Sequence, residues 1–250
     1  MKNGKDRTFC ERASGQRHSE FLIEQGEGIS CLHLCEQNKA MDSELAEIAS
    51  GANIATFYGN IEAGAHPEFY EEQYDFVITV YWPWILSEKT FSKASKTVNF
   101  HRAFLPVNRG WYPHVHSILD GSICGVTLHA IDANADTGPI WCQKEVTIRN
   151  EETALDIYLR LQREITELFQ CNWADIRSGA ICPVPQPAGQ GNYHKKAEIA
   201  ELDFLDLDAV SSVRELINKL RARSFGDRGY AYFLDENQKI FVNISLKREE

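Results

Sequence analysis

An uninterrupted apolar run in the first third of the chain restricts the fold more than any other feature. Residues 76–81 read Phe-Val-Ile-Thr-Val-Tyr and lie between Asp75 and Pro83. A strand that is buried on both faces of a parallel sheet has this pattern, whereas a strand with one wet face alternates apolar and polar residues. The run is also too short to span a membrane. It therefore predicts a central strand of a parallel sheet that is covered on both faces.

The rest of the chain predicts strands that alternate with helices. The expected strands are residues 8–10, 28–35, 54–58, a strand from 97, 125–131 and 140–148. The expected helices are residues 19–25, 42–48, 66–73, 111–119 and one from about 150. This order predicts the α/β class, with an open, mostly parallel Rossmann-like sheet. Ligands bind such sheets at the carboxyl ends of the strands.

A linker divides the predicted chain. Prolines and glycines recur between residues 183 and 191, as they do in loops. Beyond them, the apolar positions predict a helix near residues 213–220 and a hairpin of 230–234 and 240–246. We therefore expect a sheet domain over residues 1–182 and a small extension over 183–250.

Charge and cysteine usage argue against several classes of protein. The formal net charge is -10 and no run of Lys and Arg exceeds two residues, so a nucleic-acid partner is disfavoured. The seven cysteines are scattered and contain no CxxC pair, which is typical of reduced thiols in a cytoplasmic protein. The N-terminal segment lacks the apolar core of a signal peptide. The composition thus predicts a soluble protein without a membrane partner.

Three polar side chains suited to catalysis fall between Thr97 and Gly138. Asn99 and His101 lie two residues apart on a predicted strand, so their side chains share a face about 7 Å apart. Asp136 follows the next predicted strand in a loop. Each residue taken alone could be structural, since a strand histidine is often a packed one and Asp-Thr-Gly is an ordinary turn. Together they predict a catalytic asparagine, histidine and aspartate.

The motifs around these residues resemble a known family. In order they are Asn99-x-His101, Leu105-Pro106, Arg109-Gly110, Gly125 to His129 and Asp136 to Gly138. The pattern resembles the formyltransferases that use 10-formyltetrahydrofolate, which include methionyl-tRNA formyltransferase, glycinamide ribonucleotide transformylase and the sugar N-formyltransferases. Residues 108–114, 189–194 and 220–225 are most similar to the nucleotide-sugar branch.

The resemblance implies an activity and a co-substrate. A formyl group would pass from 10-formyltetrahydrofolate to the amine of a nucleotide-linked amino sugar. The expected acceptor is a dTDP-linked 4-amino- or 3-amino-4,6-dideoxyhexose made for surface polysaccharide such as O-antigen. His101 would donate to the developing oxyanion or carry a proton, Asn99 would donate to the same oxygen, and Asp136 would hold the imidazolium or accept the proton of the amine. No metal is required.

The resemblance also implies two binding regions and a homodimer. The folate would lie between the loops that contain Tyr81, Trp82, Trp84, Ile85, Asp132, Ala133 and Ala135. The nucleotide sugar would meet Arg109, Gly110, Trp111, His114 and Tyr193. Packing in the core or loop is the alternative for Trp82 and Trp84, and helix packing is the alternative for Trp111. A solvated surface position is the alternative for Arg109, His114 and Tyr193. The apolar hairpin of residues 230–246 is the expected dimer interface.

Three other functions are alternatives to sugar N-formyl transfer. Methionyl-tRNA formyltransferase carries a C-terminal barrel domain and a basic surface that this chain does not match. Glycinamide ribonucleotide transformylase leaves residues 190–250 without a role. A third alternative is a degenerate protein that binds folate or nucleotide sugar without turnover.

Two groups of possible metal ligands occur in the sequence. Cys31, His33 and Cys35 share one face of a predicted strand, and packed thiols around a histidine are the favoured interpretation, because no fourth ligand is evident. His114 and His116 stand two apart on a predicted helix and so point to different faces. The sequence therefore predicts no metal site.

Overall fold

A seven-stranded sheet organises the structure, a computed structural model that describes residues 6–10, 13–35 and 39–249. The strands follow the order β3-β2-β1-β4-β5-β7-β8. Their bounds are β1 Asp6–Cys10, β2 Ile29–Leu34, β3 Ala55–Tyr58, β4 Tyr74–Val80, β5 Ala94–His101, β7 Gly125–His129 and β8 Ile140–Glu145. Strands β1 to β5 pair in parallel, and β7 pairs with β5 in the antiparallel sense. The predicted α/β class and mostly parallel sheet are confirmed.

Strand β4 is the buried strand that its apolar run predicts. It lies between β1 and β5, so both of its edges are paired. Val77, Ile78 and Val80 are fully buried, and Thr79, the one polar residue among them, is 2% exposed. A polar side chain in such a place requires a hydrogen-bond partner, and that partner belongs to the candidate site described below.

The structure contains six α-helices and three 3-10 turns among the described residues. Their bounds are α1 Ala13–Glu24, α2 Lys39–Gly51, α3 Glu88–Phe91, α4 Pro113–Asp120, α5 Ala154–Ser178 and α6 Val213–Ala222, with 3-10 turns at Ile61–Ala63, Pro67–Glu71 and Lys196–Ala200. The helix expected from residue 19 thus starts at 13, and the helix expected at 66–73 is a 3-10 turn. Thr153 opens α5 because its amide and hydroxyl both donate to the Asp156 carboxylate.

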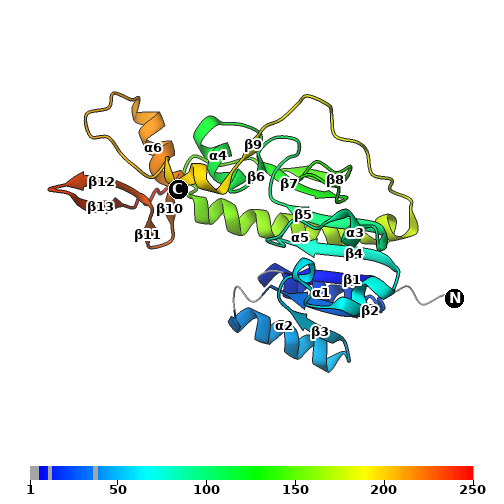
Figure 1. Ribbon diagram of the computed structural model, residues 1–250. Helices are drawn as coiled ribbons and strands as arrows, with labels where there is room; N and C mark the ends of the chain where they lie inside the picture. The colour runs from blue at the N-terminus through cyan, green and yellow to red at the C-terminus, as the bar shows by residue number, and fades with distance from the viewer. Residues whose placement is uncertain (1–5, 11–12, 36–38, 250) are drawn as a thin grey trace. The chain divides into compact units, whose positions relative to one another are not determined.

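Internal contacts divide the chain into two compact units that interleave in sequence. Unit 1 holds residues 1–101, 127–142 and 165–186, and unit 2 holds residues 102–126, 143–164 and 187–250. In unit 1, α1 and α2 pack together and α2 also contacts β3 (Figure 1). The predicted division into domains 1–182 and 183–250 stays a prediction.

Unit 2 joins segments that are distant in sequence. The short strand β6 (Arg109–Gly110) pairs with β9 (Tyr193–His194), and α4 packs against α6. Gly110 has a φ of +87°, and a Cβ there would lie 2.4 Å from the His194 carbonyl oxygen, so only glycine permits this pairing. The predicted hairpin is confirmed as β12 (Ala231–Asp235) and β13 (Gln238–Val242), with the pair β10 (Ser224–Phe225) and β11 (Arg228–Gly229) before it.

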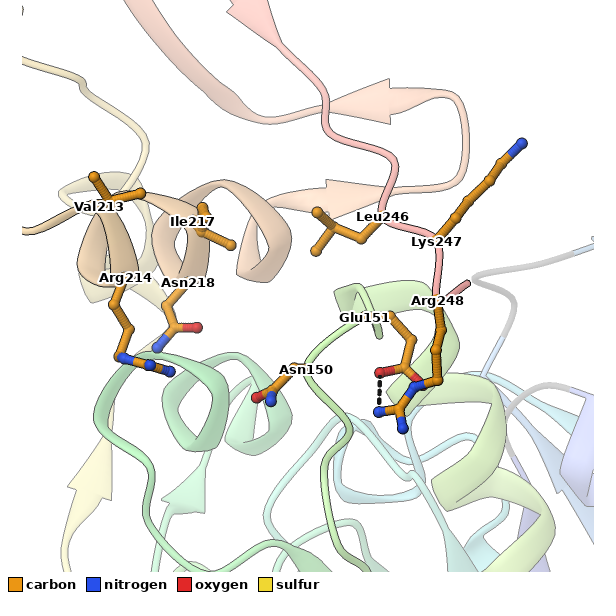
Figure 2. Close-up of a pocket in the computed structure, with 9 residues that line it drawn as sticks. All are labelled: Asn150, Glu151, Val213, Arg214, Ile217, Asn218, Leu246, Lys247 and Arg248. Atoms are coloured by element: carbon orange, nitrogen blue, oxygen red, sulfur yellow. Dashed lines mark hydrogen bonds and ion pairs between the residues drawn. The ribbon is translucent and has the colours of Figure 1, made fainter. Parts of the chain in front are cut away.

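A hollow of about 550 Å³ opens in unit 2 between α6 and the C-terminal segment. Ile217 of α6 and Leu246 face each other across it, and Lys247 points away from it (Figure 2). Arg248 closes one side through an ion pair with Glu151 at 2.9 Å. The hollow thus has an apolar centre and a charged rim.

Candidate active site

The three predicted catalytic residues come together in unit 1. Asn99 and His101 project from one face of β5, as their period-two spacing requires. The Asp136 carboxylate reaches both of them from the loop after β7. Its Oδ1 atom lies 3.4 Å from His101 Nδ1 and accepts from Asn99 Nδ2 at 3.5 Å. The His101 ring is 9% exposed, so this acid and base meet where water is largely excluded.

A network of hydrogen bonds holds Asp136 in place. The Ile131 amide donates to Thr97 Oγ1 at 2.7 Å, which ties the start of the loop to β5. At the end of the loop, the Gln186 amide donates to the carbonyls of Asp136 and Gly138. A Cβ on Gly138 would lie 1.8 Å from the Ala130 carbonyl oxygen, so the loop closes only with glycine there. The carboxylate is therefore positioned by its backbone before any ligand binds.

Two further residues orient Asn99. The buried Thr79 hydroxyl of β4 donates to Asn99 Oδ1 at 2.6 Å, which turns the NH2 group of the amide to the other side. That NH2 group lies 2.9 Å from His129 Nε2, and His129 Nδ1 lies 2.7 Å from the Ala130 carbonyl. Because a carbonyl only accepts, Nδ1 carries the proton of His129, and Nε2 is left to accept from Asn99. The donor face of Asn99 is thus set by two neighbours.

Sequence reasoning missed the roles of Thr79 and His129. Thr79 was the polar residue inside an otherwise apolar run, which is a readable signal. His129 was recognised only as part of a motif. Its position opposite Asn99 depends on the antiparallel register between β5 and β7, which the sequence alone did not predict.

The residues predicted to bind folate lie on two loops of unit 1 that share one core cluster. Trp82 and Ile131 both pack against the buried residues Ile61, Phe69, Tyr74, Val77 and Leu86. The Trp82 and Trp84 rings meet edge to face at 4.9 Å, and Ile85 is 67% exposed. Tyr81 has a φ of +54°, which marks a sharp turn directly after β4. The loops therefore offer aromatic and apolar side chains close together at the carboxyl end of β4.

Asp132 plays a structural part in the second of these loops. Its carboxylate accepts from the Thr137 hydroxyl at 2.7 Å and from the Asn134 amide at 3.1 Å. Ala133 is exposed and Ala135 is half-buried. The predicted folate contacts of these residues stay a prediction.

Four of the five residues predicted to bind nucleotide sugar gather around the β6–β9 pair of unit 2. Arg109 pairs with Tyr193 in register, and the Trp111 amide donates to the His194 carbonyl at 3.0 Å. Trp111 is 37% exposed and Tyr193 is 45% exposed. The Lys196 ammonium lies 4.5 Å from the centre of the Trp111 ring. The cluster thus presents two aromatic faces with cations beside them.

His114, the fifth residue, lies in the interior of unit 2. Its ring meets the Tyr158 ring edge-on at 5.8 Å and is surrounded by buried side chains. Burial, together with the nearby Arg102 guanidinium, lowers the pKa of His114 to about 3. His116 stacks on His194 at 3.4 Å, and burial lowers its pKa to about 4. Both imidazoles are neutral at pH 7.

Cys124 and Cys142 are thiols at neutral pH. Burial raises the pKa of Cys124 to about 11 and that of Cys142 to about 12. A thiol needs its ionised form to act as a nucleophile. Neither residue is therefore suited to covalent catalysis.

Across the part of the chain that the structure describes, no helix is both long and apolar enough to cross a membrane.

An open α/β sheet carries an Asn-His-Asp constellation beside β5, and comparison with known proteins identifies the family. Residues 32–170 match the family model described as formyl transferase, and residues 198–248 match that of the N-formyltransferase dimerization C-terminal domain. The chain belongs to the formyl transferase family. The family expected from the motifs is confirmed.

Similar proteins include enzymes that act on sugars and enzymes that act on tRNA. The dTDP-4-amino-4,6-dideoxyglucose formyltransferase of Mycobacterium bovis is 37% identical over 156 residues, which cover 62% of this chain and 66% of that protein. The match thus spans just under two thirds of that relative. The methionyl-tRNA formyltransferase of Thermodesulfovibrio yellowstonii is 32% identical over 60% of this chain and 48% of its own.

Solved structures share the fold over nearly the whole chain. The Mycobacterium tuberculosis protein Rv3404c has a TM-score of 0.83 with 26% identity, and each chain is covered to 99%. The formyltransferase PseJ of Anoxybacillus kamchatkensis, solved with a UDP-linked formamido sugar and tetrahydrofolate, has a TM-score of 0.60 with 26% identity. The alignment covers 88% of this chain and 98% of PseJ.

Proposed function

We propose that this protein is a sugar N-formyltransferase, which transfers the formyl group of 10-formyltetrahydrofolate to the amine of a nucleotide-linked amino-deoxysugar. The observation that carries the proposal is the contact of Asp136 with both Asn99 and His101 in a largely dry site. The similarity to a dTDP-4-amino-4,6-dideoxyglucose formyltransferase supports a dTDP-linked 4-amino-4,6-dideoxyhexose acceptor, with the 3-amino isomer as the alternative. The product would serve a surface polysaccharide such as O-antigen.

The residues of the site can supply each step of this chemistry. The amine attacks the formyl carbon, and the carbonyl oxygen gains negative charge as the new C–N bond forms. A protonated His101 would donate to that oxygen, and Asn99 Nδ2 would donate to it in place of its long 3.5 Å bond to Asp136. The Asp136 carboxylate accepts the proton released by the amine, directly or through water, and His101 can pass a proton to the folate nitrogen as its bond to carbon breaks. The proton count balances without a covalent enzyme intermediate.

The two loops of the shared core cluster are the folate site in this proposal. Trp82 and Trp84 offer aromatic faces, and the turn at Tyr81 leaves backbone groups at the carboxyl end of β4, where parallel sheets bind ligands. In the proposed role, Tyr81, Trp82, Trp84 and Ile85 would line one wall, and Asp132, Ala133 and Ala135 the other.

Mass spectrometry provides the direct test of the proposed function. The full chain would be incubated with 10-formyltetrahydrofolate and a panel of dTDP- and UDP-linked amino-deoxysugars, with methionyl-tRNA and glycinamide ribonucleotide in parallel. A mass gain of one formyl group on a sugar, dependent on the folate, is the expected result. A gain only on methionyl-tRNA or glycinamide ribonucleotide would replace the proposal with that rival. Folate binding without any product would favour the degenerate binder.

Trp111 gives a test of the proposed nucleotide contact. A base that stacks on an exposed aromatic ring gains about 1–3 kcal/mol. We expect Trp111→Ala to raise the KM for the nucleotide sugar about tenfold, with the KM for the folate unchanged. Trp111→Phe keeps an aromatic face and should stay within about threefold of the wild type. An unchanged KM in the alanine variant would assign Trp111 to packing.

The extension, residues 183–250, is proposed to form the contact of a homodimer, while residues 1–182 carry catalysis. Residues 198–248 match a dimerization domain of the family. The hairpin β12–β13 exposes apolar side chains, with Leu234 at 47%, Ile240 at 41% and Phe241 at 59%. An exposed apolar group of this kind is typical of an interface.

A charge on the hairpin should therefore break the dimer. We expect wild-type protein to show twice its chain mass of 28.4 kDa in light scattering, and Phe241→Glu to show the single-chain mass. Lys247→Ala is the control, because that exposed side chain follows the hairpin rather than lying on it. A dimeric Phe241→Glu variant would move the interface elsewhere.

A cytoplasmic location is part of the proposal. It is supported by Cys124, Cys142, Cys171 and Cys182, which are free thiols, as expected in a reducing compartment. Fractionation of cells that express the chain would test it.

A further inference from the structure

The structure brings two histidines and a cysteine together in unit 1. Cys31 and His33 lie on β2, and His66 precedes the 3-10 turn Pro67–Glu71. The sulfur of Cys31 and one ring nitrogen of each histidine all lie within 4.8 Å of one another. The three side chains are 1%, 0% and 5% exposed. Soft and borderline donor atoms therefore converge at one buried point.

We propose that Cys31, His33 and His66 bind a single Zn²⁺ ion. One thiolate and two imidazoles form a donor set that zinc favours, whereas Mg²⁺ and Ca²⁺ require oxygen ligands. The fourth position of the ion would be taken by water. This inference stands independently of the proposed formyl transfer.

The separation of the two imidazoles fits a shared metal. His33 Nε2 lies 3.1 Å from His66 Nδ1. Two nitrogens bound to one tetrahedral zinc ion at about 2.0–2.1 Å are separated by roughly 3.3 Å. The same two atoms could instead share one proton in a hydrogen bond. Zinc would bind the lone pairs of both nitrogens, whereas a shared proton is held by the lone pair of one nitrogen and the N–H of the other. The positions of the two rings are compatible with either arrangement.

The surrounding aromatic rings hold both imidazoles in the orientation that ligation needs. Phe57 stacks on the His66 ring at 3.4 Å and on the His33 ring at 5.3 Å. Phe69 meets both rings edge-on, at 6.3 and 6.4 Å. A site with fixed rotamers pays little entropy when it binds an ion. The zinc ion would join β2 to the crossover that leads from β3 into β4.

The sequence predicts only part of this group. It places Cys31, His33 and Cys35 on one strand face, but in the structure Cys35 is not one of the converging side chains. His66 lies 33 residues from His33 along the chain, and only the fold places it there. Cys35 directly follows β2, is 4% exposed, and so offers a matched control.

Cobalt and zinc titrations of the reduced full-length chain test the proposal. Metal-free protein would be prepared with a chelator and titrated with Co²⁺. We expect saturation at one ion per chain, a near-ultraviolet band from thiolate-to-cobalt charge transfer, and visible bands of tetrahedral intensity that zinc removes. Because a thiol binds as thiolate, uptake should release a proton and weaken at acid pH. These signals require no variant, so poor folding of a mutant cannot obscure them.

Variants assign the ligands. Cys31→Ser should lose the charge-transfer band, and His66→Gln should lower zinc affinity by at least about tenfold, since even indirect contacts to a metal are worth that much. Cys35→Ser should keep both the band and the affinity. Zinc should raise the thermal midpoint of the wild type and of Cys35→Ser only. An unaltered spectrum across the cobalt titration, or a band that survives in Cys31→Ser, would overturn the proposal in favour of a hydrogen-bonded histidine pair.

Discussion

Replacement of His101 by alanine should lower turnover about a thousandfold and leave the affinity for the folate within about threefold. General acid–base catalysis by a positioned side chain contributes about 10²–10⁴ in rate, and His101 is the residue of the site that can both donate to an oxyanion and carry a proton. Its Nδ1 atom faces Asp136 at 3.4 Å, so the carboxylate can stabilise a positive charge on the ring. The loss should appear in kcat and in kcat/KM alike.

His101→Gln separates the two roles of the imidazole. Glutamine keeps an NH donor that could stabilise the oxyanion, but it cannot transfer a proton at neutral pH. If His101 acts mainly as a donor, His101→Gln should recover much of the activity that alanine loses. If it acts as a proton carrier, the two variants should be equally poor. Full activity of the alanine variant would remove His101 from the mechanism and, with it, the proposed function.

Asp136→Asn should lower turnover about a thousandfold as well, with little change in stability. The substitution keeps the shape of the side chain, and the Gln186 bond to the Asp136 backbone carbonyl does not depend on the side chain at all. The amide, however, can neither accept the proton of the amine nor stabilise an imidazolium on His101. The substitution therefore removes one negative charge and leaves the backbone of the loop in place.

The pH profile gives this prediction a second readout. The carboxylate acts in its ionised form, so the wild-type rate should fall as the pH drops through the pKa of Asp136. Asp136→Asn has no such group, and its residual rate should lose that acid limb. Asp75→Asn removes an exposed carboxylate at the start of β4 and should keep both the wild-type rate and its profile. A normal rate in Asp136→Asn would show that water, and not this carboxylate, takes the proton.

The geometry of the site also addresses the alternative that the protein binds folate or nucleotide sugar without turnover. A protein that had lost catalysis would have no reason to keep the Asn99 amide turned by Thr79 and His129 toward Asp136. This arrangement buries the Thr79 hydroxyl and the His129 imidazole. A buried polar group lowers the stability of the fold unless it has a hydrogen-bond partner. The geometry thus favours an active enzyme over a passive binding protein.

The sequence by itself determined the features that depend on near neighbours. The apolar run of β4 specified a strand buried on both faces, since each of its side chains must leave water whichever face it occupies. The period of two placed Asn99 and His101 on one side of β5, because that geometry belongs to any strand. The ordered motifs around them identified the family, and the matches to its two models confirm it.

The tertiary structure decided what depends on residues far apart in the chain. Asp136 reaches His101 because Thr97 and Gln186 hold its loop, and His129 faces Asn99 because β7 runs antiparallel to β5. His66 joins Cys31 and His33 only when the crossover before β4 folds back over β2. Local patterns carry no information about such distant pairings, since strand register and loop closure arise from the packing of the whole sheet.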